Sequence, residues 1–167
     1  MWWLAIIPFV AQGLAIAIDE GVFHVKRGLP KWERIGHPLD TLTVIACMGY
    51  VIWVPFSTTT LSIYIALSIF STLFITKDEF VHNEHCPATE QWLHALLFIL
   101  HPTTLICAGF IWPVAQGMTV TPWIASWLNN PKALSLFLIG QFALMSLFMM
   151  YQIVFWNFIW RESSERN

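Results

Sequence analysis

The chain has 167 residues, of which 57% are hydrophobic and only 11% are Asp, Glu, Lys or Arg. This composition, with a mean hydropathy of +0.63, excludes an ordinary soluble domain and indicates an integral membrane protein. The net charge of −2 and the lack of a basic tract give no indication of a nucleic-acid partner.

The apolar residues fall into five blocks, each near the length of about 17–25 residues that crosses a bilayer. The predicted spans are Trp2–Ile18, Leu39–Ser57, Thr58–Thr76, Trp92–Met118 and Ala133–Trp160. We therefore expect an all-α integral membrane protein with five transmembrane helices in a single domain over residues 1–167. The opening sequence MWWLAIIPF has no basic residue before its apolar run, so we do not expect a cleavable signal peptide.

The segment between the first two spans carries acids and histidines at regular spacing. It reads Asp19-Glu20-x-x-x-His24 and then Pro30-x-x-Glu33-x-x-x-His37. Residues four apart share a helix face, so Glu20 pairs with His24 and Glu33 pairs with His37. Pro30 is expected at the first helical position, which places Glu33 in the first turn, where the helix dipole favours a negative charge.

The segment between the third and fourth spans repeats this pattern. It reads Asp78-Glu79-x-x-His82 and then Pro87-x-x-Glu90-x-x-x-His94. The repeat indicates an internal duplication over about residues 1–57 and 58–118, with an extra helix over 133–160. We expect two helical hairpins, related by a pseudo-two-fold axis along the membrane normal, to form a four-helix bundle. The fifth helix is expected to pack outside it, because its span contains no ionisable residue.

All six histidines lie in or beside the two copies, and helix capping alone would not require them. The predicted metal ligands are Glu20, His24, Glu33, His37, Asp78 or Glu79, His82, Glu90 and His94. Mixed carboxylate and imidazole ligands of this number suit two divalent metal ions, with iron expected and manganese or zinc as the other choices. Asp19, Asp40 and His101 are candidates for outer partners that orient the ligands. Cys86, which lies among histidines, is a further candidate ligand.

This ligand chemistry resembles that of the di-iron carboxylate proteins, whose four-helix bundles carry inward Glu and Glu-x-x-His ligands. The likeness covers about 45 residues and assigns no family, because those bundles supply four Glu and two His. Of the four acid–histidine pairs in this chain, only Glu79-Phe-Val-His82 has the i,i+3 spacing of the Glu-x-x-His motif, whereas the other three pairs are four residues apart. The resemblance implies a dinuclear centre that activates oxygen.

The expected function is that of a membrane-bound di-iron oxidoreductase of the oxygenase, hydroxylase or desaturase type. Its substrate would be lipophilic, would reach the site from the surrounding membrane lipids, and would need a separate electron donor. A metal-ion transporter or sensor, a b-type haem protein and a structural zinc site are the alternatives. Transport sites usually lie near the bilayer midplane, and haem has no use for four paired carboxylates.

The basic residues predict the orientation. Seven of the eight share one face of a five-span topology, and Lys132 alone lies opposite. The seven are Lys26, Arg27, Lys31, Arg34, Lys77, Arg161 and Arg166. The positive-inside rule then places the metal site and the C-terminus in the cytoplasm and the N-terminus outside. The bacterial inner membrane is the expected location.

Overall fold

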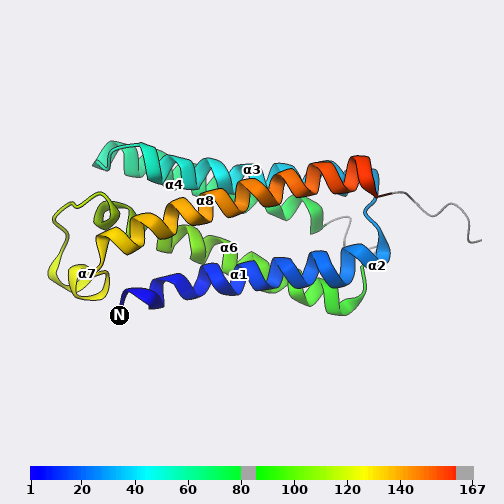
Figure 1. The fold of residues 1–167 in the computed structure, drawn as a ribbon, viewed down its shortest axis with the longest axis horizontal. Helices are drawn as coiled ribbons and strands as arrows, with labels where there is room; N and C mark the ends of the chain where they lie inside the picture. The colour runs from blue at the N-terminus through cyan, green and yellow to red at the C-terminus, as the bar shows by residue number, and fades with distance from the viewer. Residues whose placement is uncertain (80–85, 161–167) are drawn as a thin grey trace, which may run out of the picture.

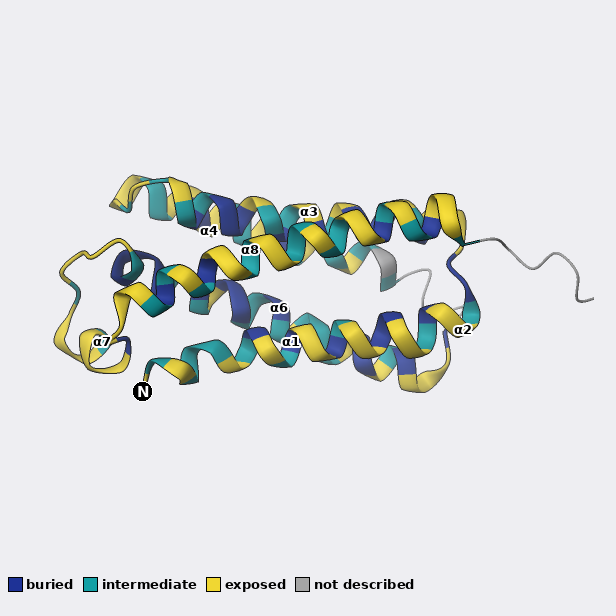
Figure 2. Ribbon diagram, in the orientation of Figure 1, coloured by how far each residue is buried: buried dark blue, intermediate teal, exposed yellow. Residues whose placement is uncertain are grey.

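The structure is a computed structural model that describes residues 1–79 and 86–160, and this part of the chain is all-helical, with 87% helix and no strand. Five helices are long and apolar enough to cross a membrane, which confirms the predicted all-α fold with five candidate spans. They cover Trp2–Arg27, Lys31–Trp53, Thr58–Lys77, Ala88–Ala115 and Pro131–Ile159. Exposed residues run along the outer faces of the helices (Figure 2). Large apolar residues, such as Leu14, Ile69 and Leu136, are among the exposed ones. This surface is typical of helices surrounded by lipid.

The first rod consists of η1 (Trp2–Ile6), α1 (Ile7–Ile18), η2 (Asp19–His24) and α2 (Val25–Arg27). The η2 segment is π-helical, so that the N–H of Val25 bonds to the carbonyl of Glu20, five residues back. Gly28 ends the rod with a φ of 77°, and α3 (Lys31–Trp53) follows. Pro30 is the residue before this helix rather than its first residue, so the predicted helix start was one position early.

The second half begins with α4 (Thr58–Phe74), which is capped by a reciprocal Ser57–Thr60 pair and continues into η3 (Ile75–Asp78). The next span, α6 (Ala88–Ala115), begins directly after Pro87 and contains Pro102 and Pro113. A short helix, α7 (Pro122–Trp127), precedes α8 (Pro131–Val154), which continues into the π-helical η4 (Phe155–Ile159). Both α3 and α6 begin well before the predicted spans, because the polar acid–histidine segments are themselves helical.

The central helix of the bundle is α6, which contacts α1, α3, α4 and α8 (Figure 1). Helix α1 packs mainly on α6, whereas α8 packs mainly on α3. The last helix also brings two buried side chains inward: Gln152 bonds to Thr41 of α3, and Trp156 bonds to Glu20 of η2. The prediction that this helix packs outside the other four is therefore wrong, because uncharged polar side chains give it an inward face. The duplicated-hairpin symmetry stays a prediction.

The aromatic core lies at the end of the bundle where α3 finishes and α6 finishes. Trp112 is fully buried there, and its Nε1 donates to the carbonyl of Val54 at 3.1 Å. The Tyr64 hydroxyl donates to the carbonyl of Leu105 at 2.7 Å. Packing at this end fixes the helices relative to one another, and the ionisable side chains are collected at the opposite end.

Candidate metal centre

Buried acids and histidines gather where η2, the starts of α3 and α6, and the end of α8 meet. They are Asp19, Glu20, His24, Glu33, Glu90 and His94. Glu33 and Glu90 occupy the first turns of their helices, as predicted. Buried charges are costly unless they are paired or bind a cation, so the partners of each group determine what the site can do.

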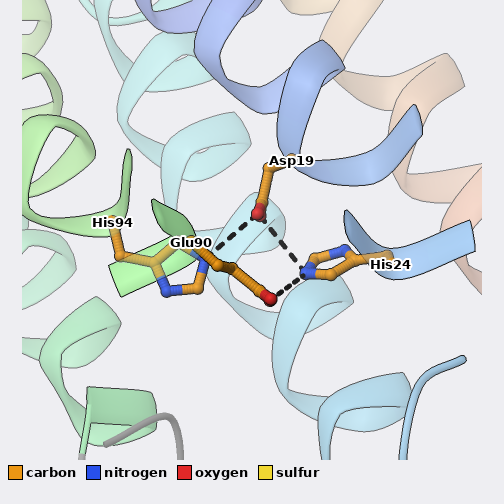
Figure 3. Close-up of side chains that lie close together, drawn as sticks. All are labelled: Asp19, His24, Glu90 and His94. Atoms are coloured by element: carbon orange, nitrogen blue, oxygen red, sulfur yellow. Dashed lines mark hydrogen bonds and ion pairs between the residues drawn. The ribbon is translucent and has the colours of Figure 1, made fainter. Parts of the chain in front are cut away.

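Four of these residues form a compact group that we call the four-residue cluster: Asp19, His24, Glu90 and His94 (Figure 3). One ligand atom from each lies within 4.8 Å of the others. His94 Nε2 is 3.1 Å from Asp19 Oδ1, and His24 Nε2 is 3.3 Å from Asp19 Oδ2 and 3.8 Å from Glu90 Oε1. A tetrahedral ion with bonds of about 2.1 Å spaces its ligand atoms about 3.4 Å apart, so these distances match a metal site.

The π-helical turn explains why Asp19, rather than Glu20, belongs to the cluster. In an α-helix, residues four apart share a face, and this spacing predicted the pair Glu20 and His24. In a π-helix the hydrogen bonds run between residues five apart, which brings Asp19 onto the face of His24. Asp19 was predicted as an outer partner, and the structure instead places it among the candidate ligands.

Glu20 is the outer partner that fixes the orientation of His24. Its Oε2 lies 3.1 Å from His24 Nδ1, and its Oε1 accepts a hydrogen bond of 2.6 Å from Trp156 Nε1. A ring that donates through Nδ1 presents the lone pair of Nε2 to the cluster. Among the described residues, His24 Nε2 has no hydrogen-bond partner despite the carboxylate oxygens nearby. A nitrogen lone pair that faces carboxylates is unfavourable unless a metal ion lies between them or Nε2 carries a proton.

Arg27 joins the two acids that begin α3 and α6. Its Nη2 lies 2.9 Å from Glu33 Oε2 and 3.0 Å from Glu90 Oε1, and its Nη1 lies 3.3 Å from Glu33 Oε1. Sequence reasoning treated Arg27 only as a marker of membrane orientation. A signal was present, because Arg27 follows His24 by three residues and so shares its helix face.

A second group of candidate ligands consists of His24, Glu33 and His37, whose ligand atoms also lie within 4.8 Å of one another. The rings of His24 and His37 are 4.8 Å apart between centroids. This group shares His24 with the four-residue cluster, and its Glu33 is paired with Arg27. Among the described residues, two ions bound together would therefore share the imidazole of His24, and the second ion would lie beside the Glu33–Arg27 pair.

The remaining predicted residues have other surroundings. Among the described residues, Glu79 belongs to neither group of candidate ligands, and the side chain of Asp78 and all of His82 lie outside what the structure describes. Asp40 forms an ion pair with Lys77. Burial raises the pKa of the Cys86 thiol to about 12, so this thiol is neutral near pH 7 and is a poor metal ligand.

A cavity of about 120 Å³ adjoins the cluster and extends along the bundle to His101. Its apolar walls come from α1, α3, α6 and α8, and include Ile16, Val44, Leu97, Phe98, Met145 and Phe148. His101 lines the cavity rather than the cluster, with Nε2 3.0 Å from Ser71 Oγ and Nδ1 3.3 Å from Gln12 Nε2. It therefore extends the site inward, and an apolar chamber lies beside the candidate ligands.

Comparison with protein-family models, curated proteins and solved structures found no match to this chain. The function is therefore argued from the geometry and chemistry of the centre itself.

Proposed function

We propose that this protein binds one divalent transition-metal ion in the four-residue cluster and uses it to oxidise or reduce a lipophilic molecule held in the adjoining cavity. The observation that carries the metal proposal is the buried Nε2 of His24, which faces Asp19 and Glu90 without a hydrogen-bond partner among the described residues. Its other ring nitrogen is engaged by Glu20, as is usual for histidines that bind a metal.

The charge balance supports a bound cation. Four buried acids lie in this region, namely Asp19, Glu20, Glu33 and Glu90, and within the described part of the chain Arg27 is the guanidinium recorded against them, through Glu33 and Glu90. If all four acids are ionised and the imidazoles are neutral, this group has a formal charge of −3. A divalent ion would offset most of that charge at a position where the ligand atoms already converge.

One ion accounts for the arrangement better than two. The dinuclear centre expected from the ligand pattern would need His24 in both metal sites and would need Arg27 to leave Glu33 and Glu90. We therefore propose that the guanidinium takes the place of a second metal. Iron and manganese fit two nitrogen and two oxygen ligands and are redox-active, whereas zinc would bind without redox chemistry.

The cavity supports a catalytic rather than a purely structural role. Asp19, His24 and His94 all border it, so an ion held between them would be reached from the cavity. When bound, the metal would supply electron transfer to or from a molecule in this chamber. Glu20 and Trp156 would hold the His24 ring in position, and the apolar walls would exclude water.

Metal content tests the proposal most directly. Protein purified in detergent, loaded with Fe²⁺ without oxygen and then dialysed, should retain about one iron per chain by elemental analysis. His94→Ala should lose most of this metal, whereas His101→Ala should keep it. The two histidines lie on the same helix and are similarly buried, at 5% and 4% exposure, so they form a matched pair. Equal losses from both variants would contradict the assignment, and two ions per chain would favour the dinuclear hypothesis.

Oxygen uptake separates redox chemistry from a structural role in the same preparation. With a lipophilic reductant present, iron-loaded protein should consume oxygen and zinc-loaded protein should not. Iron-loaded protein without oxygen uptake would contradict the oxygen-dependent oxidoreductase. Zinc that resists chelators in such inactive protein would favour the structural zinc site.

A further inference from the structure

Two buried polar pairs lie on different walls of the cavity, in addition to the acids and histidines that border it. Gln12 of α1 and His101 of α6 form one pair, and Thr41 of α3 and Gln152 of α8 form the other. All four side chains are at most 8% exposed. Polar side chains are rarely placed inside a membrane bundle unless they bind one another or a ligand.

The hydrogen bonds of the first pair can be assigned a direction. Thr43 donates to the carbonyl of Asp40, so it accepts from Ser71, and Ser71 in turn accepts from His101 Nε2. A neutral His101 that donates through Nε2 accepts through Nδ1, from the amide nitrogen of Gln12. This leaves the carbonyl oxygen of Gln12 without a hydrogen bond among the described residues.

The second pair leaves a donor. The Thr41 hydroxyl shares its one proton between the carbonyl of His37 at 3.0 Å and Gln152 Oε1 at 2.8 Å, and the Gln152 amide nitrogen makes no hydrogen bond within the described part of the chain. If either amide were turned over, its other end would be the unused one. Both glutamines line the cavity, and each therefore presents to it an amide group that a ligand can pair with.

We propose that the cavity binds the head group of a quinone-type lipid, a single ring that carries carbonyl or hydroxyl oxygens and a hydrocarbon tail. A cavity of about 150 Å³ admits benzene, so a cavity of about 120 Å³ leaves room for no more than one ring. A ring oxygen accepts from the Gln152 amide, and a hydroxyl on the reduced ring donates to the Gln12 carbonyl. The tail leaves between α1 and α8, which both line the cavity but pack mainly on other helices.

The biological role of a bound quinone rests on the proposed oxidoreductase function. A quinol gives up two electrons and two protons to become a quinone, and one molecule of oxygen that takes up both electrons and both protons becomes hydrogen peroxide. A redox-active metal held by the four-residue cluster would supply the electron transfer. Binding of the ring needs only the cavity and its amides. The two proposals can therefore fail separately.

The test compares two ligands on chelator-treated protein by native mass spectrometry. One is a benzoquinone with a ten-carbon tail, and the other is decylbenzene, which has the same tail and no oxygen. We expect the quinone to bind about tenfold more tightly, because one hydrogen bond in a buried site corresponds to about that factor. Equal affinities would overturn the proposal, whatever the metal content of the protein.

Variants locate the binding in the cavity. Gln152→Leu should weaken binding of the quinone about tenfold, and Gln12→Leu should weaken binding of the corresponding quinol about tenfold, whereas neither change should alter decylbenzene binding. Gln141→Leu is the matched control, since Gln141 lies on α8 and is not part of the cavity lining. Unchanged quinone binding in Gln152→Leu together with unchanged quinol binding in Gln12→Leu would contradict the assignment. If a variant fails to fold, the comparison of the two ligands on the unmodified protein still decides.

Discussion

Asp19 and Glu20 are adjacent acids on one turn of helix, but their side chains contact different atoms. Asp19 lies against both His24 and His94, whereas Glu20 holds the far side of the His24 ring and is itself held by Trp156. The helical geometry makes this difference, because the π-turn aligns residues five apart as well as four apart. Two carboxylates can therefore serve one histidine from its two nitrogens.

Replacing each acid by its amide distinguishes these roles. Asp19→Asn should remove most bound iron, because it deletes an anionic ligand shared by two histidines. Glu20→Gln should lower metal affinity only about 10–100-fold, as expected for a residue that orients a ligand. The measurement is a metal titration monitored against a chelator of known affinity. A larger loss from Glu20→Gln than from Asp19→Asn would restore Glu20 as the direct ligand.

At the scale of elements, the turn between α2 and α3 positions Arg27 against Glu33. Gly28 makes this turn with φ 77° and ψ 157°, a conformation that is essentially restricted to glycine. A Cβ at this position would also lie 2.5 Å from Trp160 Cζ2. The indole of Trp160 in turn lies under the guanidinium of Arg34, 4.8 Å from the ring centre. The glycine therefore lets the end of the last helix close over the turn.

Gly28→Ala should destabilise the protein by about 2–3 kcal/mol, from backbone strain and the clash with Trp160 together. Gly117→Ala is the control, because Gly117 also has a positive φ, of 72°, but no atom within 4 Å of the added Cβ. That variant should lose only about 1 kcal/mol. Thermal unfolding in detergent measures both, and equal shifts in midpoint would show that the Trp160 contact contributes nothing.

The five spans could be predicted because each is an apolar run of bilayer length, and such runs depend on composition rather than on detailed geometry. The ligand set could be predicted only in part. Helical spacing predicted His24, Glu90 and His94 as ligands. No residue pattern predicts a π-helical turn, so Asp19 was predicted only as an outer partner. The last helix was misplaced because Gln152 carries no charge, although it is buried and hydrogen-bonded inside the bundle.

At the scale of the whole molecule, the ionisable residues are concentrated at one end of the bundle and the aromatic core lies toward the other. The positive-inside rule predicts that the ionisable end faces the cytoplasm. Lys31 and Lys132 stand at opposite ends of the spans and are both exposed, so they report on the two sides of the membrane.

Cysteine labelling of intact bacterial cells tests this orientation. In a background where Cys47, Cys86 and Cys107 are replaced by Ala, Lys132→Cys should react with a membrane-impermeant maleimide. Lys31→Cys should react only after the membrane is opened, because its side should be cytoplasmic. The reverse pattern would place the metal centre on the outer side of the membrane.

The long-range contacts around His24 impose an order on biosynthesis. The first helical rod leaves the ribosome with Asp19, Glu20 and His24, but Glu90 and His94 follow only after two further spans have been made. Trp156, which donates a hydrogen bond to Glu20, lies in the fifth candidate span and is made after the other four. A nascent chain inserted as far as its second span would thus carry several acids without their final partners. Metal loading would be a late event, completed when the last helix docks, so a cell would not commit its metal to unfinished chains.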